Sequence, residues 1–347
     1  MRRVAGCRTG IVASVGRTFE DLDTIRAGIE AGARGFRLAL GLADRDHARD
    51  FETVRAAAAQ CGVDVDVLLD LPANRPRVGA MAARSFESGD RATVVDAPAA
   101  GGECEIPVPG LAAFVPHLAP GHRMWFRDGR QRFRIAEIDG RRVHVECEAC
   151  AEPVQPGNGC SFPDSAVTFE AMRPSDGALL ERLAAGGLSP EWVAASLVTS
   201  PAQVREVRAA AERIWPGRAV RVMAKIETAE AVAALDAIFD EADGGLLGRG
   251  DLALRVPVER LPRIQERVAA AAGRRDKPFA VATQILERFA ETGEAYRAEL
   301  SDVALGVRQG AAALVLCQET NDSPRPVESI QLMHRIIEME SLDENRC

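Results

Sequence analysis

Charged residues that follow apolar runs are the parts of this sequence best suited to chemistry. Of 43 basic residues, only Lys225 and Lys277 are lysines. Lys277 lies in a polar connector, whereas Lys225 ends the apolar run VRVMAKIE. A lysine kept in such an arginine-rich chain suggests a position where a compact ammonium group is required. Lys225 is therefore the first candidate catalytic residue.

Two carboxylates lie close to this lysine in the sequence pattern. Glu227 follows Lys225 by two positions, so strand alternation puts both side chains on one face. Asp251 follows the next apolar run, in GRGDLAL. Acids from successive strand ends can hold one divalent ion and leave part of its shell open to substrate oxygens. A lysine beside that ion could stabilise an enolate or a phosphoryl group in transfer.

The elements that must position these residues alternate regularly along the chain. The predicted strands are continuous apolar runs, typical of parallel strands buried on both faces, at 10–15, 35–40, 65–71, 192–198, 220–226, 244–248, 279–283 and 312–316. The predicted helices lie at 19–31, 47–60, 177–185, 201–214, 229–239, 258–272, 298–309 and 326–340. Eight strand–helix units predict an α/β protein with a closed (β/α)8 TIM barrel.

In such barrels the active site lies at the carboxyl ends of the strands. The polar residues at those ends are Arg37, Asp70, Lys225, Glu227, Arg249, Asp251, Thr283, Gln284 and Glu319. One acidic residue alone could equally form a salt bridge or cap a helix at the barrel rim. The set as a whole predicts an active site.

The alternation is interrupted once, after the third predicted strand. There, turn sequences separate short runs at 123–126, 131–138 and 141–148, and the IDG turn predicts a hairpin. We therefore predict a small β domain inserted into the barrel. The expected domains are the barrel at 1–75 and 166–347 and the inserted domain at 76–165.

Composition excludes several classes of protein. The chain has 347 residues, 47% of them hydrophobic and 27% charged, so it can bury a core. The net charge of −8 without a basic cluster argues against a nucleic-acid partner. No apolar run reaches the ~20 residues of a membrane span, and the start MRRVAGCRTG lacks a signal-type stretch. We expect a cytoplasmic protein. Eight cysteines are too dilute for a disulfide scaffold, and the spacings around Cys147 and Cys150 suit zinc poorly.

Several segments resemble pyruvate kinase. AKIETAEAVAALDAIFDEADGGLLGRGDLAL is similar to its metal and catalytic-lysine region, and KPFAVATQILERF to its ATQMLE strand. RAELSDVALGVRQGAAALVLCQET and VDVLLDLPANRPRVG resemble further family segments, and the insertion resembles the lid domain, with Asp128–Gly129 at its turn. The resemblance covers nearly the whole chain. It implies a TIM barrel with a small β-barrel lid domain inserted after strand 3, without the C-terminal domain of many members.

The resemblance also implies roles for individual residues. Lys225 would stabilise the enolate and the transferring phosphoryl group, and Glu227 and Asp251 would bind Mg²⁺ or Mn²⁺. Thr283 would orient substrate and proton. The residues implied in substrate binding are Arg37, Arg77, Asp70, Arg249, Gly250 and Thr283.

Departures from the family pattern concentrate on the nucleotide and potassium contacts. The family's NFSHG is ALGLA at 39–43, and the Thr and Lys after the third-strand Asp are Leu71 and Pro72. Asn158 replaces a lid-domain lysine, Cys317–Gln318 replace Ser-Gly, and Asp322 replaces another lysine. These changes predict diverged nucleotide contacts.

We also expect that K⁺ is not required. Arg75 falls where the GPEIR segment of typical members has Glu, and members that work without K⁺ carry a basic residue there. A fixed guanidinium could supply the charge of the ion near the substrate phosphate and Asp70.

The leading hypothesis is a pyruvate-kinase-like phosphotransferase, or a related enzyme, acting on a phosphoenolpyruvate or pyruvate enolate with a divalent metal. Its partner is then a small molecule, while the sequence leaves open the nucleotide, the phosphoryl acceptor and the oligomeric state, a homo-oligomer included. One alternative is a metal-dependent pyruvate aldolase or lyase, which the inserted domain disfavours. Another is a non-catalytic binding or regulatory paralogue, which the retained Lys225, Glu227, Asp251 and Thr283 disfavour.

Overall fold

The chain divides into two compact units. The computed structural model describes Met1, residues 8–42 and residues 45–344, so most of the basic N-terminal segment and Ala43 lie outside the described residues. The barrel unit comprises Met1–Ala73, Glu170–Gly250 and Arg260–Cys347. The inserted unit comprises Asn74–Phe169 together with Asp251–Glu259.

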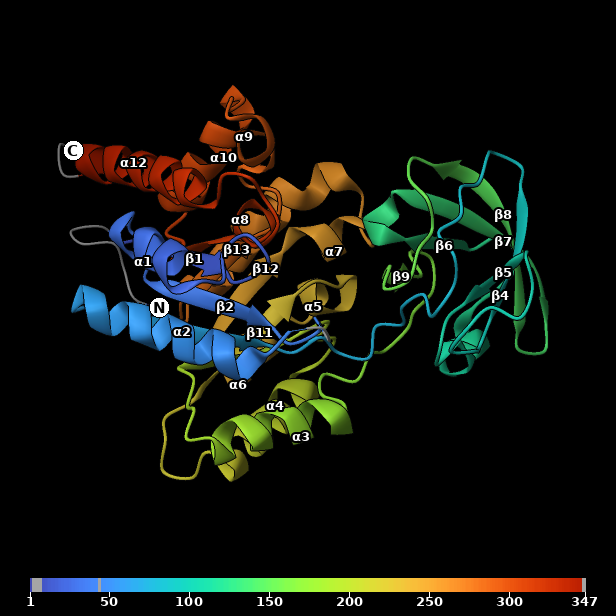
Figure 1. Cartoon of the computed structure of the whole chain (residues 1–347), viewed down its shortest axis with the longest axis horizontal. Helices are drawn as coiled ribbons and strands as arrows, with labels where there is room; N and C mark the ends of the chain where they lie inside the picture. Colours follow the sequence, from blue (N-terminus) through green and yellow to red (C-terminus); the bar gives the residue numbers. More distant parts are fainter. Residues whose placement is uncertain (2–7, 43–44, 345–347) are drawn as a thin grey trace. The chain divides into compact units, whose positions relative to one another are not determined.

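The barrel unit contains a closed barrel of eight parallel strands (Figure 1), which confirms the predicted TIM barrel. In the order of the closed sheet the strands are β1 (Gly10–Ser14), β14 (Ala313–Leu316), β13 (Phe279–Ala282), β12 (Gly244–Gly248), β11 (Arg221–Ile226), β10 (Trp192–Ala195), β3 (Asp66–Asp70) and β2 (Gly35–Ala39). Each lies inside a predicted apolar run. The runs identify the strands because both faces of a barrel strand are buried.

The long helices of the barrel unit follow their strands as predicted. They are α1 (Leu22–Glu30), α2 (His47–Cys61), α3 (Pro174–Ala185), α4 (Pro201–Ile214), α8 (Leu261–Gly273), α10 (Arg297–Arg308) and α12 (Pro326–Glu344). Short helices at strand ends were not predicted: α7 (Arg249–Ala253), α9 (Glu287–Thr292) and α11 (Gln318–Asn321). Among the described residues, no helix is long and apolar enough to cross a membrane.

Two predicted helices are corrected by the structure. The helix expected at 229–239 is two helices, α5 (Ala229–Ala233) and α6 (Leu235–Glu241), because Ala234 between them leaves the helical region with φ −101° and ψ 19°. The helix expected from 258 begins with a 3₁₀ turn, η4 (Val258–Arg260), and α8 starts only at Leu261. Pro262, in the first turn of α8, fits this later start because proline is favoured there.

The described strands of the inserted unit form one six-stranded sheet. In sheet order they are β5 (Glu105–Pro107), β4 (Arg91–Val95), β8 (Arg142–Cys150), β7 (Gln131–Asp139), β6 (Arg123–Phe126) and β9 (Cys160–Ser161). Its 3₁₀ turns are η1 (Leu111–Ala113), η2 (Val115–His117) and η3 (Arg127–Gly129). The predicted IDG hairpin is confirmed as β7–β8, where Gly140 has a φ of 57° that glycine tolerates. Strands β4, β5 and β9 were not predicted.

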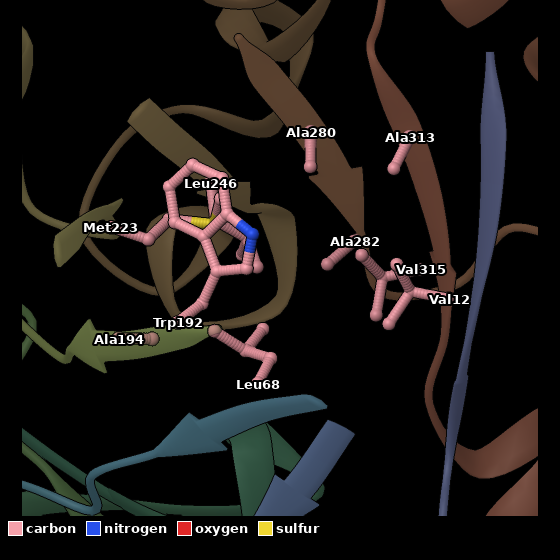
Figure 2. Packing of buried hydrophobic residues seen from close by; sticks show 10 residues of the cluster. All are labelled: Val12, Leu68, Trp192, Ala194, Met223, Leu246, Ala280, Ala282, Ala313 and Val315. Atoms are coloured by element: carbon pink, nitrogen blue, oxygen red, sulfur yellow. The ribbon is translucent and has the colours of Figure 1, made fainter. Parts of the chain in front are cut away.

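Apolar side chains fill the interior of the barrel. Figure 2 shows the large Trp192 and Met223 on one side of this core and the small Ala280, Ala282 and Ala313 across from them. The Trp192 indole Nε1 donates to Asp66 Oδ2 at 3.4 Å. Large residues opposite small ones fill the space between strands without voids.

Replacing Trp192 by Ala should leave a cavity in this core and lower the free energy of unfolding by about 3–5 kcal/mol. Urea unfolding followed by far-UV circular dichroism measures the change. The matched control is Tyr296→Ala, because the Tyr296 residue is 56% exposed and should contribute about 0.5 kcal/mol or less. A Trp192→Ala loss no larger than that of the control would contradict a packed interior.

Candidate active site

Polar side chains continue the inner face of the barrel beyond its apolar core. Alternation along a strand returns the side chain to the same face at every second residue. Leu68 of β3 belongs to the core, so Asp70 also faces inward. Met223 of β11 belongs to the core, so Lys225 and, beyond the strand, Glu227 face inward as well. The carboxyl ends of the strands therefore carry a charged layer, where barrel enzymes have their active sites.

The Asp70 carboxylate is the centre of this layer. It is 3% exposed and accepts a 2.6 Å hydrogen bond from Arg37 Nε. Ser196 Oγ donates to its other oxygen at 3.1 Å, and the Lys225 ammonium lies 3.1 Å from that same oxygen. Burial alone would favour the neutral acid, but the charges of Lys225 and Arg37 outweigh it and hold the pKa of Asp70 below its usual 3.8.

Lys225 lies between two carboxylates and a hydroxyl group. Its Nζ donates to Ser196 Oγ at 2.8 Å and lies 3.1 Å from both Asp70 Oδ1 and Glu227 Oε1. The side chain is only 11% exposed. Buried charges are stabilised when opposite charges and hydrogen bonds match them closely. The ammonium is thus fixed in position at the inner face of the barrel.

The Glu227 carboxylate occupies a niche formed by backbone. Its Oε1 faces Lys225, and its Oε2 accepts the N–H of Leu197 at 3.0 Å. A Cβ on Gly248, the last residue of β12, would lie 2.4 Å from Oε1. Glycine at 248 is therefore required for the carboxylate to lie here. Two oxygens held in place are hard ligands of the kind that Mg²⁺ and Mn²⁺ prefer.

Arg37 adds a second cation to the layer. Its Nη1 donates to Ser14 Oγ at 3.0 Å and lies 3.9 Å from Cys317 Sγ. Burial opposes its charge, but Asp70 together with Cys317 and Glu227 raises the pKa of Arg37 above its usual range. Burial also raises the pKa of Cys317, with Arg37 opposing in part, so Cys317 is a thiol rather than a nucleophilic thiolate at neutral pH.

Thr283 begins a strained turn after β13. Thr283 and Gln284 have φ of 79° and 56°, a region that β-branched residues rarely adopt. The Arg249 guanidinium donates to the Thr283 carbonyl at 2.8 Å and is itself held by Asp302 at 2.6 and 2.7 Å. A Cβ on Gly250 would lie 2.9 Å from Thr283 Cγ2. The Arg249 side chain thus holds the backbone that presents Thr283.

Glu319 braces the ends of β13 and β14. Its carboxylate is buried and accepts the N–H of Ile285 at 3.0 Å and that of Cys317 at 2.7 Å. Thr320 adds a hydrogen bond from its hydroxyl to the Ser14 carbonyl and accepts the Ser14 N–H, both at 2.9 Å. The Glu319 carboxylate and the Thr320 hydroxyl group thus connect strand ends to one another and limit movement of the site.

The remaining predicted site residues belong to the inserted unit. There, Arg75 Nη1 donates to Asp251 Oδ1 at 2.7 Å, and Arg75 Nη2 donates to Ser161 Oγ at 2.9 Å. Arg77 Nη1 donates to the Gly157 carbonyl at 3.0 Å. Asp251, which was expected to bind metal, is therefore paired with Arg75, which was expected to replace K⁺.

The predicted residues thus fall into three groups. The barrel unit brings together Arg37, Asp70, Lys225 and Glu227 in one network, and Arg249, Gly250 and Thr283 in another. Asp251 is in contact with Arg75 in the inserted unit. Sequence reasoning missed Ser14, Ser196 and Asp302. Alternation could have found Ser196, which follows the inward residues Trp192 and Ala194 by the same step of two.

The described part of the chain contains no group of three or more His, Cys, Asp or Glu residues placed to hold a metal. A divalent ion bound by Glu227 would therefore need further oxygen ligands for the rest of its shell. The Cys147 and Cys150 sulfur atoms lie 3.2 Å apart on β8, and burial raises the pKa of Cys150 to about 12. That dithiol has no third ligand of these types among the described residues.

A closed barrel with an inserted β unit, and with a lysine held among carboxylates at the strand ends, defines a (β/α)8 protein of enzyme type. The family model described as "Pyruvate kinase, barrel domain" matches residues 7–330. The chain belongs to the pyruvate kinase family.

Curated relatives agree with this assignment. Pyruvate kinase of Methylorubrum extorquens is 33% identical over 346 residues, covering 97% of this chain and 69% of the relative. Pyruvate kinase of Mycobacterium tuberculosis is 34% identical over 336 residues, covering 95% and 69%. Pyruvate kinase 2 of Synechocystis is 30% identical over 340 residues, covering 95% and 56%. The chain thus spans between about half and two thirds of the length of these relatives.

Replacing Asp70 by Asn should leave Arg37 and Lys225 buried with too little negative charge and cost about 3–5 kcal/mol of unfolding free energy at pH 7. The pKa of Asp70 is lower in the folded chain than the 3.8 of an unperturbed acid. The stabilisation is therefore present above about pH 3.8 and lost as the pH falls through the folded value.

Urea unfolding at pH 7, 5 and 3.5 measures this dependence. The difference in unfolding free energy between the wild type and Asp70→Asn should be the same at pH 7 and pH 5 and smaller at pH 3.5. Asp236→Asn, which removes a surface acid paired with Arg274 and Arg275, should change little at any pH. An equally small effect of Asp70→Asn would contradict the central role of this carboxylate.

Proposed function

We propose that this protein is a pyruvate-kinase-like enzyme that acts on a phosphoenolpyruvate or pyruvate enolate with a divalent metal. The observation that carries the proposal is the Lys225 ammonium, fixed at 2.8–3.1 Å from Ser196, Asp70 and Glu227 on the inner face of the barrel. A fixed cation stabilises charge that develops in the transition state without reorganising at that moment. Family membership supports the same chemistry.

The two cations of the charged layer suit an anionic substrate. Arg37 would bind the phosphate, because a guanidinium can donate two parallel hydrogen bonds to phosphate oxygens. Lys225 would stabilise the enolate oxygen and the phosphoryl group in transfer. Thr283, presented by its strained turn, would orient the substrate and the proton at the methyl carbon. Arg249 acts through the backbone of that turn, since its guanidinium is bonded to the Thr283 carbonyl.

Glu227 and Asp251 would hold the divalent metal. The niche left open by Gly248 fits this role, because it keeps the oxygens of Glu227 in place. When bound, Mg²⁺ or Mn²⁺ would supply Lewis-acid polarisation of the substrate oxygens. The Lys225 ammonium, 3.1 Å from Glu227 Oε1, would stabilise charge on the substrate oxygens from the side of the barrel wall.

The phosphoryl acceptor is proposed to differ from that of typical members. Asp322, where the family pattern has Lys, lines a cavity of about 90 Å³ with Arg17 and Arg45 among the described residues. An acid in place of a lysine makes this cavity less attractive to phosphates. A related enolpyruvate reaction with another acceptor is therefore the more specific proposal.

The two alternatives are less well supported. A pyruvate lyase of the same barrel type would not need the inserted unit, which here forms a six-stranded sheet of its own. A non-catalytic paralogue would not need two cations matched around Asp70 at the strand ends. The following experiment separates the non-catalytic alternative from the main proposal.

With Mg²⁺ present and no nucleotide, the enzyme should exchange the methyl protons of pyruvate with solvent. Proton NMR in D₂O measures the exchange. Lys225→Met should lower its rate on the order of a thousandfold while pyruvate still binds, because the ammonium acts mainly on charge that forms in the transition state. Glu227→Gln should lower it through loss of metal.

Lys277→Met is the matched control. Lys277 is the second lysine of the chain, and its ammonium donates to the Phe239 carbonyl at 2.5 Å. It has no role in the proposed chemistry. This variant should keep the wild-type exchange rate. Exchange by the wild type that is no faster than in Glu227→Gln would favour the non-catalytic alternative and reject the proposal.

Independence from K⁺ is proposed from the charges around Asp70. Both oxygens of this carboxylate already have partners, Arg37 on one and Ser196 with Lys225 on the other. Leu71, which follows it, has no side-chain oxygen to offer a cation, and neither has Ala39 on β2. A monovalent ion has too few ligands here to lose its water favourably. In the inserted unit, Arg75 adds a fixed positive charge.

The rate of pyruvate proton exchange should therefore stay unchanged when K⁺ is replaced by tetramethylammonium at equal ionic strength. Arg75→Glu should lower the rate strongly, since it exchanges the fixed cation for an anion. Activation of the wild type by K⁺ of tenfold or more would contradict both the charge argument and the role of Arg75.

A further inference from the structure

Arg75 is held in one position by three neighbours within the inserted unit. Its guanidinium donates to Asp251 at 2.7 Å and to Ser161 at 2.9 Å, and the side chain is 12% exposed. A Cβ on Gly159 would lie 2.9 Å from both Cζ and Nε of Arg75. Only glycine at 159 leaves room for the guanidinium there, so this is a built site for an arginine side chain.

The backbone around Arg75 is fixed to the same strand that contacts its side chain. Cys160 N donates to the Pro76 carbonyl at 2.8 Å, and Arg77 forms an antiparallel bridge with Gly159. Gly159 and Cys160 thus hold the backbone that follows Arg75, and Ser161 holds its guanidinium. Because of these contacts, the Arg75 side chain cannot leave Asp251 without losing several interactions. The ion pair with Asp251 is therefore a lasting feature of the inserted unit.

We propose that Arg75 and a divalent metal compete for the carboxylate of Asp251. This inference rests on the proposed function, in which Asp251 is a metal ligand. Arg75 Nη1, 2.7 Å from Asp251 Oδ1, donates a hydrogen bond that occupies a lone pair of this oxygen, and the guanidinium charge repels a second cation at the same carboxylate. Arg75 thus lowers the metal affinity of the substrate-free protein.

Mn²⁺ binding tests the competition directly, because the electron paramagnetic resonance signal of free Mn²⁺ reports its concentration without any turnover. The titration is carried out at fixed pH without substrate or nucleotide. Arg75→Gln should tighten Mn²⁺ binding on the order of tenfold, as expected when a partly buried ion pair is released. Ser161→Ala keeps the charge but loosens the guanidinium, so it should tighten binding by a smaller factor.

Arg142→Gln controls for the general effect of removing one positive charge. Arg142 lies in the same unit and is paired with Glu105 at 2.8 Å, so its loss should leave Mn²⁺ affinity unchanged. The double variant with Arg75→Gln and Asp251→Asn should lose the gain of the single Arg75 variant. Circular dichroism confirms that each variant is folded.

The outcomes separate the inference from the function on which it rests. Equal Mn²⁺ affinity in the wild type and Arg75→Gln, with weaker binding in Asp251→Asn and Glu227→Gln, would overturn the competition and leave the metal site standing. No effect of Asp251→Asn or Glu227→Gln would overturn the metal site, and the competition with it. Equal tightening in Arg142→Gln would also overturn the competition, because only net charge would then matter.

Discussion

The structure of the barrel site depends on one buried carboxylate, that of Asp70, which is matched by two cations. Removing a charge from water costs several kcal/mol unless partners replace the lost hydration. Arg37 at 2.6 Å and Lys225 at 3.1 Å provide that replacement for Asp70, and Asp70 provides it for them. The second carboxylate, Glu227, completes the balance by facing Lys225. Each of these four residues therefore restricts the charge that its neighbours can carry.

This balance is compatible with the fold because a barrel strand separates two environments along its length. Near its start, the inner face of β10 carries Trp192, packed among apolar side chains, whereas Ser196 beyond its end donates to Asp70. The same inward step of two residues thus passes from a dry core to a charged layer. The apolar core lies directly beneath the charged layer and lowers the local dielectric constant, which strengthens the electrostatic interactions within the layer.

Sequence reasoning identified the parts of this design that have a local pattern. Apolar runs located all eight barrel strands, and the scarcity of lysine singled out Lys225. Features without a local pattern were missed. Ser196 looks like any serine after a strand, and the break between α5 and α6 falls at an alanine, which favours helix. The pairing of Arg75 with Asp251 joins residues 176 positions apart, which only the three-dimensional fold brings together.

The niche of Glu227 has a consequence for how sequences of this barrel can vary. A Cβ at position 248 would lie only 2.4 Å from Glu227 Oε1, so side chains at the two positions compete for the same space. A side chain at 248 is compatible with the site only if the acid at 227 becomes shorter, as in a change to Asp. A side chain at 248 beside an unchanged Glu227 would displace the carboxylate from Lys225 and from the N–H of Leu197. Positions 248 and 227 are therefore sterically coupled, and a larger residue at 248 requires a change at 227.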